Sequence, residues 1–393
     1  MGIFKGISWV LGLSMLVQPA MAGTGDTEVL YENSSYTPLL TLIQSAQHSI
    51  DIEIYEIKDQ QIQNGVIAAM DRGVKVRVIQ ESEAVQSGCG IFEPIDAKDS
   101  VDCQSQKSFM QKVRAKGGGY VPYAYQQFCP GSDSGSGRCL EHGKMVLVDS
   151  KAVLISTGNF NPSNLCDPNG SSSPLSVCNR DYSVLSTDAN VVSVMETIFS
   201  SDFASKAYDL PRILKTAKAG KLTVSPYSLS PTIAFIRSAR ESILIENQYL
   251  KNPQMNNELI AAAQRGVKVF VIVSSICSFG PKDPKKDASE ISQWTNTYTA
   301  FDHAGINTSI FSKQIQVDGK DGYLHAKAIV VDSKIAWVGS VNGSTQALTE
   351  NREFGIFLTQ QDQVTRLAQY MTADFQDAGA ESWQDSLSCQ KDR

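Results

Sequence analysis

Two stretches of the chain repeat one pattern of apolar and polar positions. Residues 49–79, SIDIEIYEIKDQQIQNGVIAAMDRGVKVRVI, align without a gap on residues 242–272, SILIENQYLKNPQMNNELIAAAQRGVKVFVI, and 17 of the 31 positions are identical. In each copy the pattern predicts a strand (Ile50–Ile57 and Ile243–Leu250), a helix, a Gly turn and a second apolar strand. We therefore expect two βαβ units, each with parallel strands and a right-handed crossover.

The surrounding sequence fits the same duplication. An amphipathic helix with a Ser/Thr-Pro start is predicted before each unit. We expect two homologous α/β halves, residues 23–205 and 225–393, joined by a linker at 206–224. In each half, mixed or parallel sheets would be flanked by helices. Three stretches that do not match are predicted to be loops, where substrate choice usually resides: 80–110, 160–178 and 273–298.

A second repeated pattern carries the candidate chemistry. The two copies read LEHGKMVLVDSKAVLISTGN at residues 140–159 and YLHAKAIVVDSKIAWVGSVN at residues 323–342. Because residues i and i+2 of a strand point to the same face, His142 projects together with Lys144, and His325 with Lys327. An apolar strand follows each pair, so we expect each pair where a core strand emerges into a cleft.

Two such strands meeting about a pseudo-twofold axis would put two His, two Lys and two Asn, Asn159 and Asn342, into one pocket. Lysine and amide donors suit the oxygens of a phosphate. One imidazole can attack phosphorus, while the other protonates the leaving oxygen and then activates water. The arrangement predicts phosphodiester chemistry that requires no metal and no cofactor.

Each catalytic histidine also needs an acceptor for its other ring nitrogen. The sequences NRDYSV (179–184) and NREFGI (351–356) follow the two motifs and nominate Asp181 for His142 and Glu353 for His325. The remaining histidines, His48 and His303, stand in no such pattern, and we expect them to be surface residues.

The motif HxKxxxxD, followed by Gly/Ser and Asn and present twice, resembles the phospholipase D superfamily. The resemblance covers nearly the whole chain after residue 22, and it implies one metal-independent site between the halves and a phosphohistidine intermediate. By the family's usual order, His142 would be the nucleophile and His325 the acid/base. Further roles implied by the resemblance are phosphate binding by Lys144, Lys327, Asn159, Asn342, Thr157 and Ser340, and support of the motif strands by Asp149 and Asp332. The first copy departs from the family's Gly-Ser position, because Ser156 and Thr157 stand there.

The first 22 residues, MGIFKGISWVLGLSMLVQPAMA, are typical of a secretory signal cleaved after Ala22. A membrane anchor is the alternative, but the apolar run is short and broken, and no later stretch is long enough to cross a bilayer. The prediction is a secreted or periplasmic protein. Eight cysteines in such a protein favour disulfides, and we expect the pairs Cys89–Cys103, Cys129–Cys139, Cys166–Cys178 and Cys277–Cys389.

The phosphodiester itself is less constrained by the sequence. The stretch ILIENQYL (243–250) is similar to one in lipid-cleaving phospholipases D, where Glu246, Asn247 and Gln248 would support the site. A formal charge of −6 counts against a general nucleic-acid binder. We therefore expect a phospholipid head-group hydrolase acting at a membrane or micelle surface, with a nuclease as the alternative. A non-catalytic binding module is a third possibility. A monomer suffices, because one chain carries both motifs.

Overall fold

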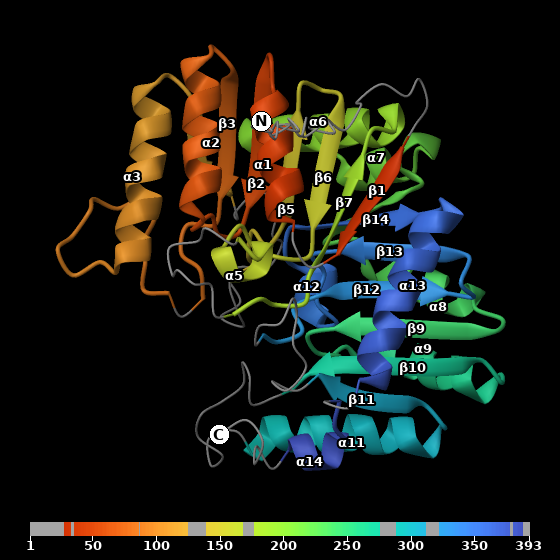
Figure 1. The fold of residues 1–393 in the computed structure, drawn as a ribbon. Helices are drawn as coiled ribbons and strands as arrows, with labels where there is room; N and C mark the ends of the chain where they lie inside the picture. The colour runs from red at the N-terminus through yellow and green to blue at the C-terminus, as the bar shows by residue number, and fades with distance from the viewer. Residues whose placement is uncertain are drawn as a thin grey trace, which may run out of the picture.

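The computed structural model describes residues 27–32, 35–85, 87–124, 139–167, 177–275, 288–311, 322–377 and 380–387. It contains two seven-stranded mixed sheets with the same topology (Figure 1). The first sheet has the order β1 (Glu28–Glu32), β7 (Tyr182–Ser186), β6 (Ala152–Ser156), β5 (Lys144–Val148), β2 (Ser49–Ile54), β3 (Lys75–Gln80) and β4 (Gly119–Pro122). The second has the order β8 (Leu222–Ser225), β14 (Glu353–Leu358), β13 (Ile335–Gly339), β12 (Lys327–Val331), β9 (Ser242–Asn247), β10 (Lys268–Ser274) and β11 (Asn307–Phe311). The predicted pair of homologous α/β halves is confirmed.

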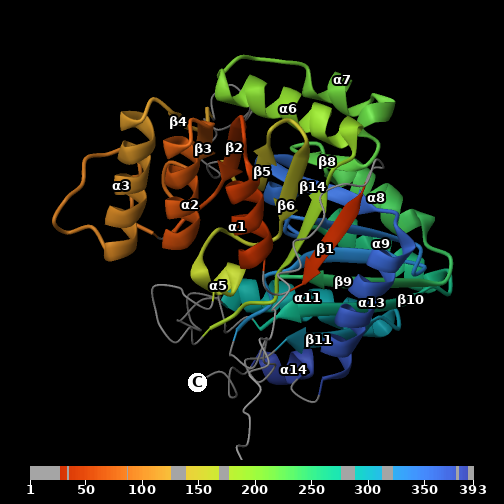
Figure 2. The same cartoon turned by 45° about the horizontal axis from the view of Figure 1, so that its top comes forward.

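Helices cover both sheets, and a core lies between the sheets. One apolar cluster joins the inner faces of both sheets to α6 (Ala189–Phe203) and α13 (Gln361–Gln376). On the opposite face of the first sheet lie α1 (Tyr36–Ser45), α2 (Gln60–Asp71) and α3 (Val101–Ala115), as Figure 2 shows. On the opposite face of the second lie α8 (Leu229–Ser238), α9 (Pro253–Gln264) and α11 (Ala288–His303). The shorter helices are α5 (Pro162–Leu165), α7 (Leu210–Leu214), η2 (Ala217–Ala219), α12 (Thr345–Thr349) and α14 (Trp383–Ser386).

Both predicted βαβ units are present, with β2 parallel to β3 and β9 parallel to β10. Each helix begins at a side-chain cap, since Asp59 accepts from the backbone N–H groups of α2 and Asn252 from that of Met255 in α9. The first strand of each unit is shorter than predicted. The strand ends at Ile54 in the first unit and at Asn247 in the second. The chain then turns and forms a single bridge to the residue just after the HxK motif, Ile57 to Phe160 in the first half and Leu250 to Gly343 in the second.

The second sheet begins earlier than predicted. Strand β8 starts at Leu222, inside the stretch 206–224 that the sequence assigned to a linker, and pairs antiparallel with β14. Leu222 and Val224 are buried in the core between the sheets, which explains why this short segment joins the sheet. The preceding part of the predicted linker contains α7 and η2.

Buried ion pairs cross between the halves in a reciprocal manner. Arg180 of the first half donates from Nε and Nη2 to the carboxylate of Asp374 in the second, both at 2.6 Å. Arg352 of the second half approaches Asp202 of the first, at 3.1 Å from Nη2 and 3.0 Å from Nε. Since each arginine directly precedes a predicted histidine-orienting carboxylate, these pairs fix the turns that carry the site.

We predict that Asp374→Ala lowers the free energy of unfolding by about 3–5 kcal/mol, because it leaves the guanidinium of Arg180 buried without its bidentate partner. Chemical denaturation of the purified protein measures the change. The matched control is Glu241→Ala, which removes an exposed ion pair with Lys334 and should cost less than about 1 kcal/mol. Equal losses in the two variants would contradict this view of the interface.

The disulfides Cys89–Cys103 and Cys166–Cys178 are present as predicted. The other two predicted pairs, Cys129–Cys139 and Cys277–Cys389, each involve residues outside the described part of the chain, as does the predicted signal peptide. Within the described ranges, no helix combines the length and apolar composition that a bilayer crossing requires.

Candidate active site

The two HxK motifs meet where the halves join. The backbone N–H of His142 donates to the carbonyl of Arg352, and that of His325 donates to the carbonyl of Arg180. The turn before β14 in the second half thereby holds His142, and the turn before β7 in the first half holds His325. Strands β5 and β12 begin two residues later, at Lys144 and Lys327, so each histidine directly precedes the start of a buried strand. The predicted convergence of the two motifs is confirmed.

The positive charges of both lysines reach both histidines. Burial lowers the pKa of His142 well below its usual range, and the charges of Lys144 and Lys327 lower it further. Burial and the charge of Lys327 lower the pKa of His325 to about 4, against the opposing carboxylate of Asp181. Burial also lowers the pKa of Lys144 to about 8 and that of Lys327 to about 7. A bound anion would reverse these shifts, because it favours the charged form of every group around it.

The orienting carboxylates are exchanged between the halves, which corrects the sequence-based assignment. Nδ1 of His142 lies 2.9 Å from both carboxylate oxygens of Glu353, and Nδ1 of His325 lies 3.0 Å from Oδ1 of Asp181. The expected pairs were the reverse. The physical reason is that the turns before β7 and β14 leave their own sheets and pair with the segment preceding the HxK strand of the other half.

The two orienting carboxylates differ in pKa, and therefore in how readily each is ionised. Burial raises the pKa of Glu353 to about 7, against the charge of Lys144. Burial also acts to raise the pKa of Asp181, but the adjoining His325 and Lys327 outweigh it and hold that pKa below its ordinary value. At neutral pH, Asp181 is therefore the more firmly ionised partner.

The two predicted asparagines lie at the ends of the motifs, in buried positions. Asn159 is 8% exposed and Asn342 is 5% exposed, and Oδ1 of each has no hydrogen-bond partner among the described residues. A buried polar atom without a partner is costly unless something binds it. These oxygens can accept only from a donor such as a hydroxyl or water, whereas a phosphate oxygen would accept from the Nδ2–H groups of the two amides. Asn247, predicted to support the site, accepts from the backbone N–H of Gly343, next to Asn342.

The structure gives Thr157 and Ser340 a role other than the predicted phosphate binding. Thr157 is fully buried, and its hydroxyl donates to Oδ1 of Asp181 at 2.6 Å. The hydroxyl of Ser340 is also buried, accepts from the backbone N–H of Phe354 and donates to the carbonyl of Phe354 at 3.4 Å. A hydroxyl has one proton to donate, so neither is free for a phosphate. Thr157 supports an orienting carboxylate instead, and Ser340 holds the backbone next to Glu353.

Asp149 and Asp332 support the motif strands, as predicted. Each lies at the end of its strand remote from the histidine and accepts from three consecutive backbone N–H groups. Those of Asp332 belong to Arg240, Glu241 and Ser242. Each carboxylate thus ties the HxK strand to the start of the neighbouring strand.

We predict that Asp332→Ala lowers the free energy of unfolding by about 1.5–3 kcal/mol at neutral pH, the loss expected for charge-assisted hydrogen bonds. Burial acts to raise the pKa of Asp332, but its three backbone donors outweigh burial and hold the pKa below its ordinary value of 3.8. The stabilisation is therefore complete above that value and is lost as pH falls through the folded-state pKa. Denaturation at pH 7 and pH 3 measures this, and a difference that persists unchanged at pH 3 would contradict it.

Sequence reasoning missed three residues that contact the histidine pair. The ring of Tyr55 meets that of His142 edge-on, with centroids 4.9 Å apart, and Tyr323 meets His325 in the same way at 5.7 Å. Nδ2 of Asn164 lies 3.2 Å from Nδ1 of His325. No repeat signal marks them, because none of the three has an identical counterpart in the other half.

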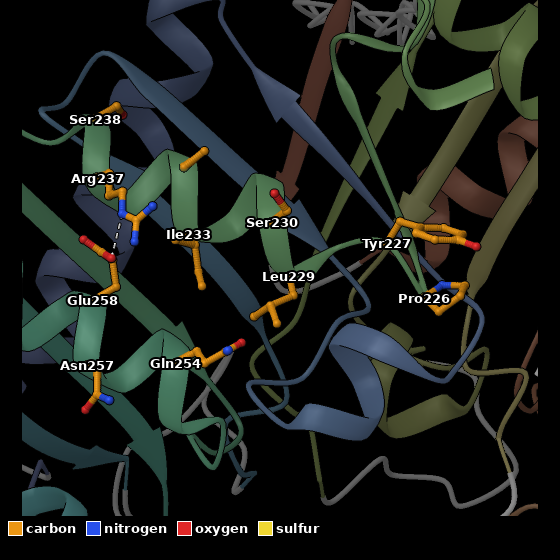
Figure 3. Close-up of a pocket in the computed structure, with 11 residues that line it drawn as sticks. Pro226, Tyr227, Leu229, Ser230, Ile233, Arg237, Ser238, Gln254, Asn257 and Glu258 are labelled. Atoms are coloured by element: carbon orange, nitrogen blue, oxygen red, sulfur yellow. Dashed lines mark hydrogen bonds and ion pairs between the residues drawn. The ribbon is translucent and has the colours of Figure 1, made fainter. Parts of the chain in front are cut away.

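Two further features lie apart from the site. No group of three or more His, Cys, Asp or Glu side chains in the described residues is arranged to hold a metal ion. A groove of about 980 Å³ runs between α8 and α9, with the ion pair of Arg237 and Glu258 at one end (Figure 3). None of the site residues lines this groove, so it is separate from the chemistry.

A duplicated scaffold that places one His–Lys pair from each half in a single buried site defines a two-histidine phosphodiester site. The chain belongs to the phospholipase D superfamily, because residues 39–203 and 232–377 match the family described as "Cardiolipin synthase, PLD-like domain". The two matched segments fall within the two predicted halves.

Individual relatives are distant. The chain is 21% identical over 361 residues to the probable cardiolipin synthase YwiE of Bacillus subtilis (strain 168), covering 88% of this chain and 64% of that protein. It is 29% identical over 140 residues to the human mitochondrial cardiolipin hydrolase, covering 36% of this chain and 47% of that protein. The chain thus spans less than two thirds of either relative.

Among solved structures, phosphatidylserine synthase of Haemophilus influenzae Rd KW20 matches with a TM-score of 0.60 and 13% identity, over 90% of this chain and 87% of that one. The polyphosphate kinase of Porphyromonas gingivalis matches with a TM-score of 0.56 and 15% identity, over 90% of this chain and 51% of that one. At these identities the likeness concerns the fold alone.

Proposed function

We propose that the protein is an exported phospholipase D-type phosphodiesterase that removes the head group from a glycerophospholipid and leaves phosphatidic acid. The observation that carries the proposal is the exchange of partners at the site: each half supplies a histidine, and the other half supplies the carboxylate that orients it. Nδ1–H of each imidazole is then held by a carboxylate, and Nε2 is left for the substrate.

The proposed reaction has two in-line displacements. Nε2 of His142 attacks phosphorus, the bond from phosphorus to the head-group oxygen breaks, and His325 donates its proton to that oxygen. Water then gives a proton to His325 and attacks phosphorus, and the phosphorus–nitrogen bond breaks. Lys144 and Lys327 stabilise the negative charge on the phosphate oxygens, and the amides of Asn159 and Asn342 complete the cradle. The negative substrate also favours protonation of His325, which its surroundings otherwise disfavour.

The different partners of the two histidines support this division of roles. Asp181, with its lowered pKa, is suited to stabilise an imidazolium and so to maintain an acid. Glu353, whose pKa is raised to about 7, stabilises a positive charge on His142 less well. A neutral imidazole is the form that attacks, so the partner of His142 fits the nucleophile.

The lipid assignment is supported by the names of the relatives, which include a cardiolipin synthase, a cardiolipin hydrolase and a phosphatidylserine synthase. Two of those names denote synthesis, so an alcohol is a second candidate acceptor beside water. Export is supported by the signal-like residues 1–22 and by the two disulfides. One chain carries both motifs, so a monomer completes the site.

The test is head-group release from mixed phospholipid micelles in the presence of a chelator, with a single-stranded oligonucleotide as a parallel substrate. Lipid turnover without oligonucleotide cleavage is the expected result. Adding glycerol to the same reaction separates hydrolysis, which yields phosphatidic acid, from transfer, which yields phosphatidylglycerol. Cleavage of the oligonucleotide alone would overturn the lipid assignment in favour of a nuclease, and no turnover of either substrate would favour a binding module.

A further inference from the structure

The two orienting carboxylates are held by different sets of donors. Glu353 receives an amide N–H from Asn351, two residues earlier in the same turn, at 3.1 Å. The residue equivalent to Asn351 in the other turn is Asn179. Oδ1 of each accepts from a backbone N–H of the opposite half, that of Leu140 for Asn351 and that of Tyr323 for Asn179. The side-chain N–H groups differ, since among the described residues Asn179 donates none to Asp181, and the near-symmetry of the site breaks here.

Asn164 supplies the missing amide from another element, the short helix α5. Its Nδ2 donates to Oδ2 of Asp181 at 2.8 Å, while Oδ1 of Asp181 accepts from Thr157 and from His325. In the second half, the position aligned with Asn164 is Ala347, in α12. Within the described part of the chain, this contact is thus found on the His325 side of the site and not on the His142 side.

The position of Asn164 is fixed by the Cys166–Cys178 disulfide. Cys166 ends α5 two residues after Asn164, and Cys178 lies three residues before Asp181. The disulfide brings their Cα atoms to 5.0 Å, and the backbone N–H of Asn179 donates to the carbonyl of Ser163 at 2.8 Å. The asparagine and the carboxylate that it contacts therefore belong to one cross-linked unit.

We propose that Asn164 is a positioning residue for the acid/base His325, acting through Asp181, and that the Cys166–Cys178 disulfide keeps it in place. The inference rests on the proposed two-histidine reaction. The amide N–H stabilises the ionised form of Asp181, and that carboxylate keeps a proton on Nδ1 of His325. Nε2 then faces the substrate in the tautomer that proton transfer requires. Nδ2 of Asn164 also lies 3.2 Å from Nδ1 of His325, but both nitrogens are donors in this tautomer, so the hydrogen bond of the amide goes to Asp181.

The test uses a substrate that separates the two steps of the reaction, phosphatidyl-p-nitrophenol. Nitrophenolate leaves without a proton, so formation of the phosphohistidine needs no acid, whereas its hydrolysis still needs His325 as base. In Asn164→Ala we expect the burst of nitrophenol to stay within about twofold of the wild type. The steady-state kcat should fall by about 10- to 100-fold, because the variant loses part of the rate enhancement of about 10²- to 10⁴-fold that general acid–base catalysis supplies. KM should change little.

Two controls define the specificity of the effect. Asn161→Ala removes an amide three residues earlier that donates to Glu56 and contacts neither histidine, so burst and turnover should match the wild type. The double substitution of Cys166 and Cys178 by Ser should reproduce the Asn164→Ala result, whereas the same change at Cys89 and Cys103 should not. Asn164→Leu, which removes the donor without leaving a cavity or adding a second carboxylate beside Asp181, replaces Asn164→Ala if that variant does not fold.

A second readout is independent of turnover. The chain has four histidines, so their ring signals can be assigned in NMR spectra by single substitutions. Asn164→Leu should shift the Nδ1 signal of His325 and leave that of His142 unchanged. Equal loss of burst and turnover, or an unshifted His325 signal, would overturn the inference. Failure of the wild-type protein to turn over any phosphodiester would count against the proposed function, while the NMR shift would still report the contact.

Discussion

Replacement of His142 or His325 by alanine is expected to lower kcat on a phospholipid by at least about 10⁴-fold, the scale of loss when one member of a catalytic unit is removed. The two variants should differ with phosphatidyl-p-nitrophenol. His142→Ala removes the attacking nitrogen and should give no burst. His325→Ala keeps the nucleophile, and the activated leaving group needs no acid, so one equivalent of nitrophenol should be released before turnover stops. Stopped-flow absorbance measures both phases.

The chain offers matched controls for this experiment. His48 and His303 are exposed and lie outside the site, so His48→Ala and His303→Ala should keep kcat within about twofold of the wild type, as expected for surface substitutions. A burst from His142→Ala together with none from His325→Ala would reverse the assigned roles. Turnover by both variants near the wild-type rate would remove the two-histidine mechanism altogether.

Neutralising either orienting carboxylate is the second change with a large expected effect. Glu353→Gln and Asp181→Asn keep the shape of each side chain but present an amide to Nδ1, which permits the wrong tautomer of the imidazole. Loss of such an orienting charge costs up to about 10⁴-fold in kcat in the comparable serine protease triad. We expect about 10²- to 10⁴-fold losses in both variants, measured on the same lipid substrate.

The exchange between halves makes this experiment selective. Glu353→Gln should shift the ring signals of His142 in NMR spectra, and Asp181→Asn those of His325, although each carboxylate lies nearer in sequence to the other histidine's motif. Asn351→Ala is a graded control, because it removes one donor to Glu353 and leaves the carboxylate in place. Shifts at the histidine of the same half would contradict the exchanged pairing.

The duplicated fold and the convergence of the motifs could be predicted from the sequence because each rests on a pattern that occurs twice. Two βαβ units with the same apolar periodicity require two similar sheets. Two HxK strands with the same polar start place His142 and His325 at equivalent points of those sheets. In such cases the repeat itself rules out chance.

The pairing of carboxylates could not be predicted for the same reason. Asp181 and Glu353 occupy equivalent positions, so either assignment to the histidines satisfies the sequence equally well. The choice depends on which way the turns before β7 and β14 run after the strands pair, and that is decided by packing between the halves, including the ion pairs of Arg180 and Arg352.

Residues without a repeated counterpart were also beyond sequence reasoning. Asn164 contacts Asp181 only because α5 is cross-linked to the segment that carries the carboxylate. The place of Thr157 in the motif predicts phosphate binding by its hydroxyl. In the folded site its single proton goes to Asp181 at 2.6 Å, a contact that the motif does not reveal.

Trapping the covalent intermediate tests the two-histidine mechanism most directly. The protein would be mixed with phosphatidyl-p-nitrophenol in the presence of a chelator, quenched within the burst, and digested for mass spectrometry. The mechanism predicts a phosphatidyl adduct on His142, absent in His142→Ala and accumulated in His325→Ala. An adduct on any other residue, or the absence of an adduct until a metal ion is added, would contradict it.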